Sequence, residues 1–216
     1  MTLDLFEFDS TLSGTECMGR QACVLRGFAV PCAPDLLSAL ETIQKSSPFR
    51  HMVTPGGYLM SVALTNCGAM GWASDRHGYR YTRQDPESRQ AWPPMPDSFL
   101  RLARTAATEA GFADFEPDAC LINRYLPGTR LSLHQDKNEK DLEAPIVSVS
   151  LGIPAVFLFG GHERGDRAAR VPLFHGDVAV WGGVDRMRYH GVMPLKEADH
   201  PLLGAQRINL TFRKAA

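Results

Sequence analysis

Short runs of alternating apolar and polar residues fill the second half of the chain, and Gly, Pro and Asp separate these runs. A period of two residues predicts β-strands that bury one face. Eight short strands at close spacing are typical of a sandwich or barrel. The expected strands cover residues 120–125, 131–134, 146–151, 155–159, 171–174, 177–181, 188–192 and 207–212.

Two earlier segments follow the period of a helix instead. Residues 34–45 carry one apolar stripe, and Pro34 suits the first turn of a helix. Residues 96–110 carry a second stripe, and Gly111 is a plausible stop after it. Two helices before eight strands predict a mostly β fold of the α+β class, with the helices packed outside a jelly roll.

Between the helices, residues 47–96 are rich in Gly, Pro, Tyr, Trp and Arg, with only short strand-like pieces such as 58–64. A long irregular segment inside a compact domain is usually a functional lid or a disordered insert. Its aromatic residues argue against disorder. We therefore expect one domain over residues 1–216, with a lid at 47–96 and the jelly-roll core at 118–213.

The bulk composition argues against several classes of protein. The chain has 216 residues and a net charge of −1, so no global basic field attracts nucleic acid, and such binding would need a local patch. Five widely spaced cysteines without a Cys-x-x-Cys pair argue against a disulfide framework and for a reducing compartment. The chain lacks the basic start of a signal peptide and any run of about 18 apolar residues. We expect a cytoplasmic protein with no membrane partner.

The candidate chemistry centres on His134-Gln135-Asp136 and on His190. Two imidazoles and one carboxylate hold non-haem Fe(II) on one face and leave the opposite face open. His134 and Asp136 stand two apart at a strand end and can therefore reach one ion. In a jelly roll, a later strand can return His190 beside them. Zinc or manganese could use the same three side chains.

Chance alone predicts roughly one His-x-acid pattern in such a chain, and two are present. The second, His175-Gly176-Asp177, lies between two apolar runs and has the composition of a turn. We interpret His175 as a turn residue. Spacing alone leaves open that His134 and Asp136 form a surface motif unrelated to His190.

A candidate anion clamp lies near the C-terminus, where polar and apolar residues alternate over 207–213. The simpler interpretation is a half-buried strand with a solvated polar face. In a barrel, the polar face can instead point into the interior. There the planar guanidinium of an arginine can bind a carboxylate through two hydrogen bonds. Asn123 and Tyr125 share a face of an earlier strand, and both can donate to an anion. Together these features fit a dicarboxylate bound beside a metal.

These motifs closely resemble the AlkB family of Fe(II)/2-oxoglutarate dioxygenases, which reverse N-alkyl damage on nucleobases. The resemblance covers nearly the whole chain beyond about residue 20. The Arg-x-Asn-x-Thr-Phe-Arg run is more specific than any His-x-Asp pattern. The matching segments are 53–58, 123–125, 134–139, the surroundings of His190, and 207–213.

The resemblance implies a double-stranded β-helix with an N-terminal nucleotide-recognition lid. His134, Asp136 and His190 would hold Fe(II), with 2-oxoglutarate and O2 as cosubstrates. The enzyme would remove lesions of the 1-methyladenine and 3-methylcytosine type from DNA or RNA and release formaldehyde, succinate and CO2. The implied 2-oxoglutarate residues are Asn123, Tyr125, Arg207, Asn209 and Arg213.

For the substrate, the resemblance implies that Trp72 stacks on the base opposite the ring of His134. Tyr79 would contact a phosphate, and Arg164 would help to bind the strand. Asn138 stands where the family commonly has an acidic residue, and its neutral amide can still accept a hydrogen bond. The target atom lies inside a duplex, so the base must be flipped or come from a single strand. We expect a monomer that favours single-stranded DNA.

The sequence is also compatible with two other functions. The same core could hydroxylate a protein or a small molecule, or the chain could be a non-enzymatic module that binds metal or nucleic acid. Residues 76–83 interleave cations with aromatics, a combination that grips phosphates and stacks bases. An ordinary solvated loop could have the same composition.

Overall fold

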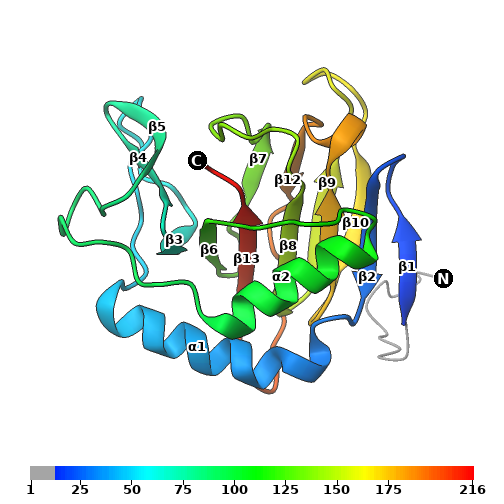
Figure 1. Cartoon of the computed structure of the whole chain (residues 1–216), viewed down its shortest axis with the longest axis horizontal. Coiled ribbons are helices and arrows are strands. Elements are labelled where there is room, and N and C mark those ends of the chain that lie inside the picture. Colours follow the sequence, from blue (N-terminus) through cyan, green and yellow to red (C-terminus); the bar gives the residue numbers. More distant parts are fainter. Residues whose placement is uncertain (1–12) are drawn as a thin grey trace.

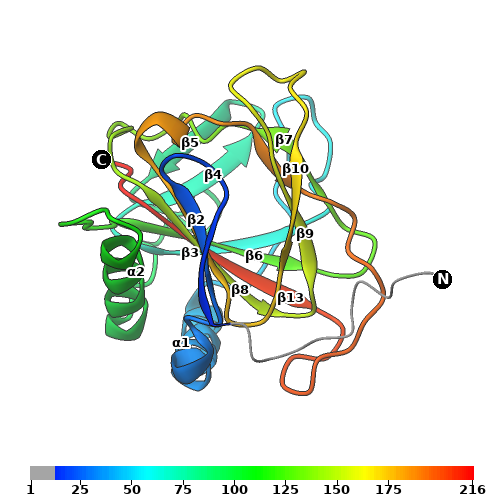
Figure 2. The same ribbon diagram turned by 90° about the vertical axis from the view of Figure 1, so that its right-hand side faces the viewer.

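Two helices cover one face of a seven-stranded antiparallel sheet, and a four-stranded sheet lies against the other face (Figure 1). The computed structural model describes residues 13–216. Figure 2 shows α1 and α2 on one side of β8 and β13, with β9 and β10 on the other side. The chain therefore forms the jelly roll predicted from its strand pattern.

The larger sheet has the order β1-β2-β11-β8-β13-β6-β3, and the smaller sheet has the order β10-β9-β12-β7. A separate two-stranded hairpin pairs β4 with β5. The strands are β1 Gly14–Cys17, β2 Ala22–Arg26, β3 Ala63–Gly68, β4 Gly71–Asp75, β5 Gly78–Thr82, β6 Ala119–Tyr125, β7 Leu131–His134, β8 Ile146–Gly152, β9 Ala155–Phe159, β10 Ala169–Leu173, β11 Val178–Trp181, β12 His190–Val192 and β13 Arg207–Arg213. The helices are α1 Ala33–Ser46 and α2 Asp97–Glu109, with short 3-10 turns at Val30–Cys32 and Gly183–Asp185.

Both predicted helices are confirmed, and each buries the apolar stripe that its sequence indicated. In α1 the buried side chains include Leu36 and Leu40, and a proline occupies the first turn. In α2 they include Phe99 and Leu102. Gly111 follows α2 with a φ of +88°, a conformation that favours glycine and ends the helix. None of the helices within residues 13–216 is long and apolar enough to cross a membrane.

Strand β13 separates the two layers of the core. Its apolar residues, Ile208, Leu210 and Phe212, pack against the helices. Its polar residues point between the two sheets, and all seven residues of the strand are buried. The interpretation of a solvated polar face is therefore wrong, because the smaller sheet covers that face and excludes water from it.

All eight predicted strands are present, but the larger sheet also contains β1, β2 and β3. Strand β2 is a fully buried run of five residues without alternation, which gives no period-two signal. Strand β3 lies inside the segment expected to be a lid and pairs with β6. In this part of the chain, β4 and β5 form the hairpin that stands apart from both sheets (Figure 1).

The second His-x-Asp pattern is a turn, as its composition indicated. Gly176 has a φ of +86°, and Asp177 accepts hydrogen bonds from the backbone amides of Gly27 and Phe174. Asp177 also forms a buried ion pair with Arg26, with 2.5 Å between Oδ2 and Nη1. This carboxylate therefore ties β2 to the turn between β10 and β11.

We predict that Asp177→Ala lowers the free energy of unfolding by about 3 kcal/mol, because Arg26 loses its buried counter-charge and two amides lose their acceptor. Urea denaturation measures this change. The matched control is Glu116→Ala, which breaks an exposed ion pair with Arg104 and should cost less than about 1 kcal/mol. Equal losses in the two variants would contradict the structural role given to Asp177.

Candidate active site

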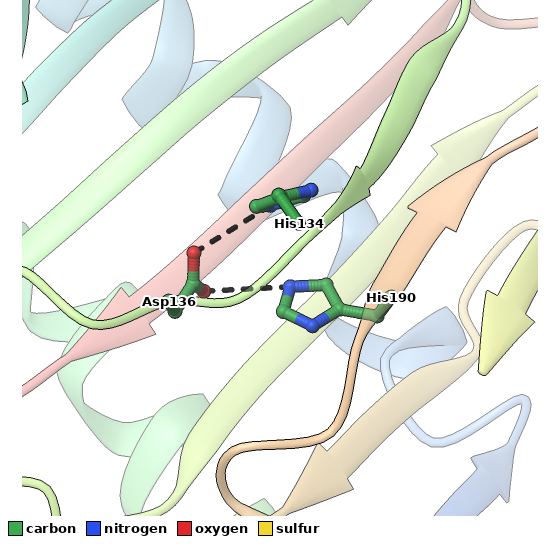
Figure 3. A group of neighbouring side chains, drawn as sticks. All are labelled: His134, Asp136 and His190. Atoms are coloured by element: carbon green, nitrogen blue, oxygen red, sulfur yellow. Dashed lines mark ion pairs between the residues drawn. The ribbon is translucent and has the colours of Figure 1, made fainter. Parts of the chain in front are cut away.

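His134, Asp136 and His190 converge at one end of the smaller sheet (Figure 3). His134 ends β7 and lies opposite His190 of β12 in the strand register. Asp136 follows β7 in a loop. The Nε2 atoms of His134 and His190 lie 3.6 Å from Oδ1 and Oδ2 of Asp136, respectively. The three ligand atoms lie within 4.8 Å of one another, so one ion can bind all three.

Backbone carbonyls fix the orientation of both imidazole rings. The Nδ1–H of His134 donates to the carbonyl of Ser132 at 2.9 Å, and that of His190 donates to Arg188 at 3.0 Å. Each Nε2 therefore carries the lone pair and faces the proposed ion. Burial, together with the nearby His134, lowers the pKa of His190 and favours the neutral ring that a metal needs.

Arg213 holds the carboxylate of Asp136 in its charged form. Its Nε and Nη2 atoms donate to Oδ2 of Asp136 at 2.8 and 2.6 Å. Burial alone would raise the pKa of Asp136, but the charge of Arg213 lowers it well below the usual range. The site thus offers one anionic oxygen ligand and two neutral nitrogen ligands, the donor set of non-haem Fe(II) oxygenases.

Arg207 is a buried cation without a counter-ion in the part of the chain that the structure describes. Its side chain is 2% exposed, and Nη2 donates to the hydroxyl of Ser150 at 2.9 Å. Its Nε and Nη1 atoms have no hydrogen-bond partner among residues 13–216. Burial lowers the pKa of Arg207, because the charged form is disfavoured away from water. These unpaired donors of a buried guanidinium can bind an anionic oxygen.

The other residues assigned to the cosubstrate line the same interior. Tyr125 places its ring 5.1 Å from the Arg207 guanidinium carbon. Asn123 is buried on β6, directly opposite Asn209 of β13. The Asn209 amide donates to Ser148 and Val149, so the protein itself occupies these donors. Arg213, which we expected at the cosubstrate, binds the carboxylate of Asp136.

The structure brings Trp72 and Tyr79 together on the β4–β5 hairpin. Their rings stack with 5.5 Å between centroids and 16° between planes. Trp72 rests on the buried pair Leu64 and Leu121, and Tyr79 is 46% exposed. Leu64 itself lies buried in β3, beneath Trp72.

The remaining candidates for substrate binding lie on the surface. Asn138 is exposed in the loop after β7. Arg164 is exposed between β9 and β10, with its guanidinium carbon 5.2 Å from the centre of the Tyr189 ring. Neither residue contacts the three candidate ligands directly. Both are free to meet a large ligand that approaches from solvent.

Sequence reasoning missed three side chains that surround Asp136: Tyr81, Glu139 and Arg186. Glu139 ends the His-x-Asp-x-x-Glu run of residues 134–139, which was only a weak indication that Glu139 lies near the site. Arg186 carried no signal, because 50 residues separate it from Asp136, whose backbone carbonyl it binds at 2.8 Å. Tyr81 was noted only as part of a run of cations and aromatics.

Comparison with known proteins agrees with this geometry. The model of the 2OG-Fe(II) oxygenase superfamily matches residues 21–213. The chain is 57% identical to the alpha-ketoglutarate-dependent dioxygenase AlkB of Salmonella typhimurium over 99% of this chain and 98% of that protein. It is also 57% identical to AlkB of Escherichia coli K12, over 93% of each chain. The solved structure of OsALKBH1 matches with a TM-score of 0.81 at 26% identity and covers 93% of this chain and 100% of that one.

A jelly roll that carries two histidines and a carboxylate at one end defines the class of non-haem iron oxygenases. Within that class, the chain belongs to the AlkB family of the 2OG-Fe(II) oxygenase superfamily. It is a dioxygenase that uses Fe(II) and 2-oxoglutarate. The buried, unpaired Arg207 fits this cosubstrate, because 2-oxoglutarate ends in a carboxylate that can accept a hydrogen bond from its free donors.

We predict that Arg207→Met stabilises the protein without ligands and abolishes its response to 2-oxoglutarate. Replacing a buried unpaired cation by a side chain of similar length should raise the free energy of unfolding by about 1–3 kcal/mol. The affinity for 2-oxoglutarate should fall by about 100-fold. Urea denaturation with and without Mn(II) and 2-oxoglutarate measures both effects, since ligand binding stabilises only the folded state.

The exposed Arg170→Met is the control for this experiment and should change neither quantity. A variant at Arg207 that is still stabilised by 2-oxoglutarate to the same extent as the wild type would contradict the carboxylate pocket.

Proposed function

We propose that this dioxygenase removes N-alkyl groups from nucleobases of the 1-methyladenine and 3-methylcytosine type in DNA and RNA. The observation that carries this proposal is the position of a stacked aromatic pair, the half-buried Trp72 and the exposed Tyr79, on a hairpin that Tyr81 links to the loop that carries Asp136. Shorter matches support nucleic acid as substrate: they include proteins named tRNA demethylase abh1 in Schizosaccharomyces pombe and nucleic acid dioxygenase ALKBH1 in mouse.

In this proposal His134, Asp136 and His190 hold Fe(II), and Arg207 holds the distal carboxylate of 2-oxoglutarate. Bound iron supplies the oxidation, in which one oxygen atom of O2 enters succinate and the other enters the N-methyl group, which then leaves as formaldehyde. The protein orients the target carbon and keeps water out of the interior between the sheets. Tyr125 and Asn123 complete the wall on the β6 side, together with Asn209 and Arg213 on β13.

We propose that the flipped base lies between the ring of Trp72 and the ring of His134, whose side chain is 33% exposed. Base-aromatic stacking tolerates every base because each has a π-face. Tyr79 is placed to donate its hydroxyl to a phosphate of the strand, and Arg164 offers a second positive contact. Asn138 can accept a hydrogen bond from an exocyclic amine but adds no negative charge. The lid in this proposal is residues 47–96 without β3.

A single-stranded substrate suits this site best, because no base pair must be broken before the base reaches Trp72. We also propose that the enzyme acts as a monomer. All five cysteines are unpaired, which supports a reducing compartment such as the cytoplasm.

The direct test measures formaldehyde and succinate on a panel of methylated single-stranded and double-stranded oligonucleotides, with unmethylated strands as controls. We expect equal amounts of the two products on methylated single strands and slower turnover on duplexes. Succinate formation without formaldehyde on every oligonucleotide would instead favour a protein or small-molecule substrate.

We predict that Trp72→Ala lowers kcat/KM for a methylated oligonucleotide by roughly 10- to 100-fold, because one base loses its stacking partner. The slow turnover of 2-oxoglutarate without oligonucleotide should stay unchanged, since Trp72 does not reach Arg207. Coupled assays of formaldehyde and succinate measure both rates. Leu202→Ala removes an exposed apolar side chain elsewhere and serves as the control. Unchanged oligonucleotide repair by the Trp72 variant would refute the stacking role.

A further inference from the structure

A buried network of charges surrounds the candidate metal carboxylate. Glu139 and Arg186 have side chains that are each 2% exposed, with 3.3 Å between Oε2 and Nη2. Arg186 also donates to the backbone carbonyls of Asp136 and Ala144. Arg213 lies between the two carboxylates of Asp136 and Glu139. Two arginines and two carboxylates thus balance each other where water has little access.

The β4–β5 hairpin contributes one neutral group to this network. Tyr81 donates its hydroxyl to Oε1 of Glu139 at 2.6 Å. Burial raises the pKa of Tyr81 well above its ordinary value, so the hydroxyl keeps its proton and remains a donor. Tyr81 lies opposite Trp72 in the register of the hairpin and two residues after Tyr79. All three aromatic side chains therefore share one face of the hairpin.

The Arg213 guanidinium lies near two carboxylate acceptors, Asp136 and Glu139, and the Tyr81 hydroxyl affects how strongly Glu139 competes for it. The Nε atom of Arg213 lies 2.8 Å from Oδ2 of Asp136 and 3.5 Å from Oε1 of Glu139. The Tyr81 hydroxyl already occupies Oε1. Without it, Oε1 becomes a better acceptor, and the guanidinium is drawn away from Asp136. The Asp136 carboxylate would then lose the two hydrogen bonds that fix its rotation.

We propose that Tyr81 is a positioning residue, which acts through Glu139 and Arg213 to fix the orientation of the Asp136 carboxylate toward the metal. The β4–β5 hairpin thereby contributes to the metal site as well as to the binding of the base. The inference rests on the proposed metal site. It adds to that site a hydroxyl from a different part of the chain, which contacts neither metal ligand nor substrate.

The experiment titrates Co(II), in place of Fe(II), into the metal-free protein and records the visible d–d absorption. We expect Tyr81→Phe to weaken Co(II) binding by about tenfold, at the low end of the range for groups that orient metal ligands. The d–d bands should also shift, because the carboxylate no longer approaches the ion in one orientation. Phenylalanine keeps the ring, so the urea midpoint of the metal-free variant serves to verify folding.

Tyr79→Phe is the matched control for metal binding. It removes a hydroxyl from the same face of the same strand, and this hydroxyl has no hydrogen-bond partner among residues 13–216. It should leave the Co(II) affinity and spectrum unchanged. In a Glu139→Gln background, Tyr81→Phe should weaken Co(II) binding much less than it does in the wild type. The reason is that both substitutions act on the same series of contacts, from Tyr81 through Glu139 to Arg213.

The outcomes separate the two proposals. A wild-type protein that binds no Co(II) would overturn the metal site and this inference with it. A wild type that binds Co(II), together with a Tyr81→Phe variant of identical affinity and spectrum, would overturn the positioning role alone. Equal and additive effects of Tyr81→Phe in both backgrounds would show that Tyr81 does not act through Glu139.

Discussion

The structure depends on how charged side chains are accommodated between two sheets. Arg207 and Arg213 are buried there, and Arg186 is buried beside the loop that carries Asp136. A buried charge without a partner is costly in a medium of low dielectric constant. Arg213 and Arg186 find carboxylates within the chain. Arg207 has no carboxylate partner among residues 13–216, and its unpaired donors can bind an anion. A carboxylate of 2-oxoglutarate would supply this counter-charge.

This arrangement explains why helices cover one face of the larger sheet and a second sheet covers the other. The apolar residues of β13 pack against α1 and α2 and provide a core that needs no ligand. The polar residues of the same strand face inward, where the smaller sheet supplies His134 and His190. The two faces of β13 thus have different roles: the apolar face contributes to stability, and the polar face contributes to the site. Packing of the apolar face against the helices holds the polar side chains in position.

The sequence was sufficient to predict the elements whose periodicity is strong and the ligands that lie close to strand ends. Alternation in β13 and the helical stripes of α1 and α2 reported local preferences, which the structure retains. The convergence of His134 with His190 followed from the return of strands in a jelly roll. Strand β2 escaped notice because both of its faces are buried, which removes the alternation. The contacts of Arg186 with Asp136 and Glu139 could not be predicted, because they depend on packing between distant segments.

The segment 134–139 shows how one short stretch can serve the metal and the substrate separately. It has no strand partner after His134, so side chains hold its path: Gln135 donates to the carbonyl of Met187 at 2.6 Å, and Arg186 donates to that of Asp136. These anchors leave Asn138 exposed. A change at Asn138 should therefore leave Asp136 in place, and in the proposed binding mode it would alter the charge presented to the base. Because Arg213 and Arg186 hold Asp136 while Asn138 is exposed, the proposed base contact can change without moving the candidate metal ligand.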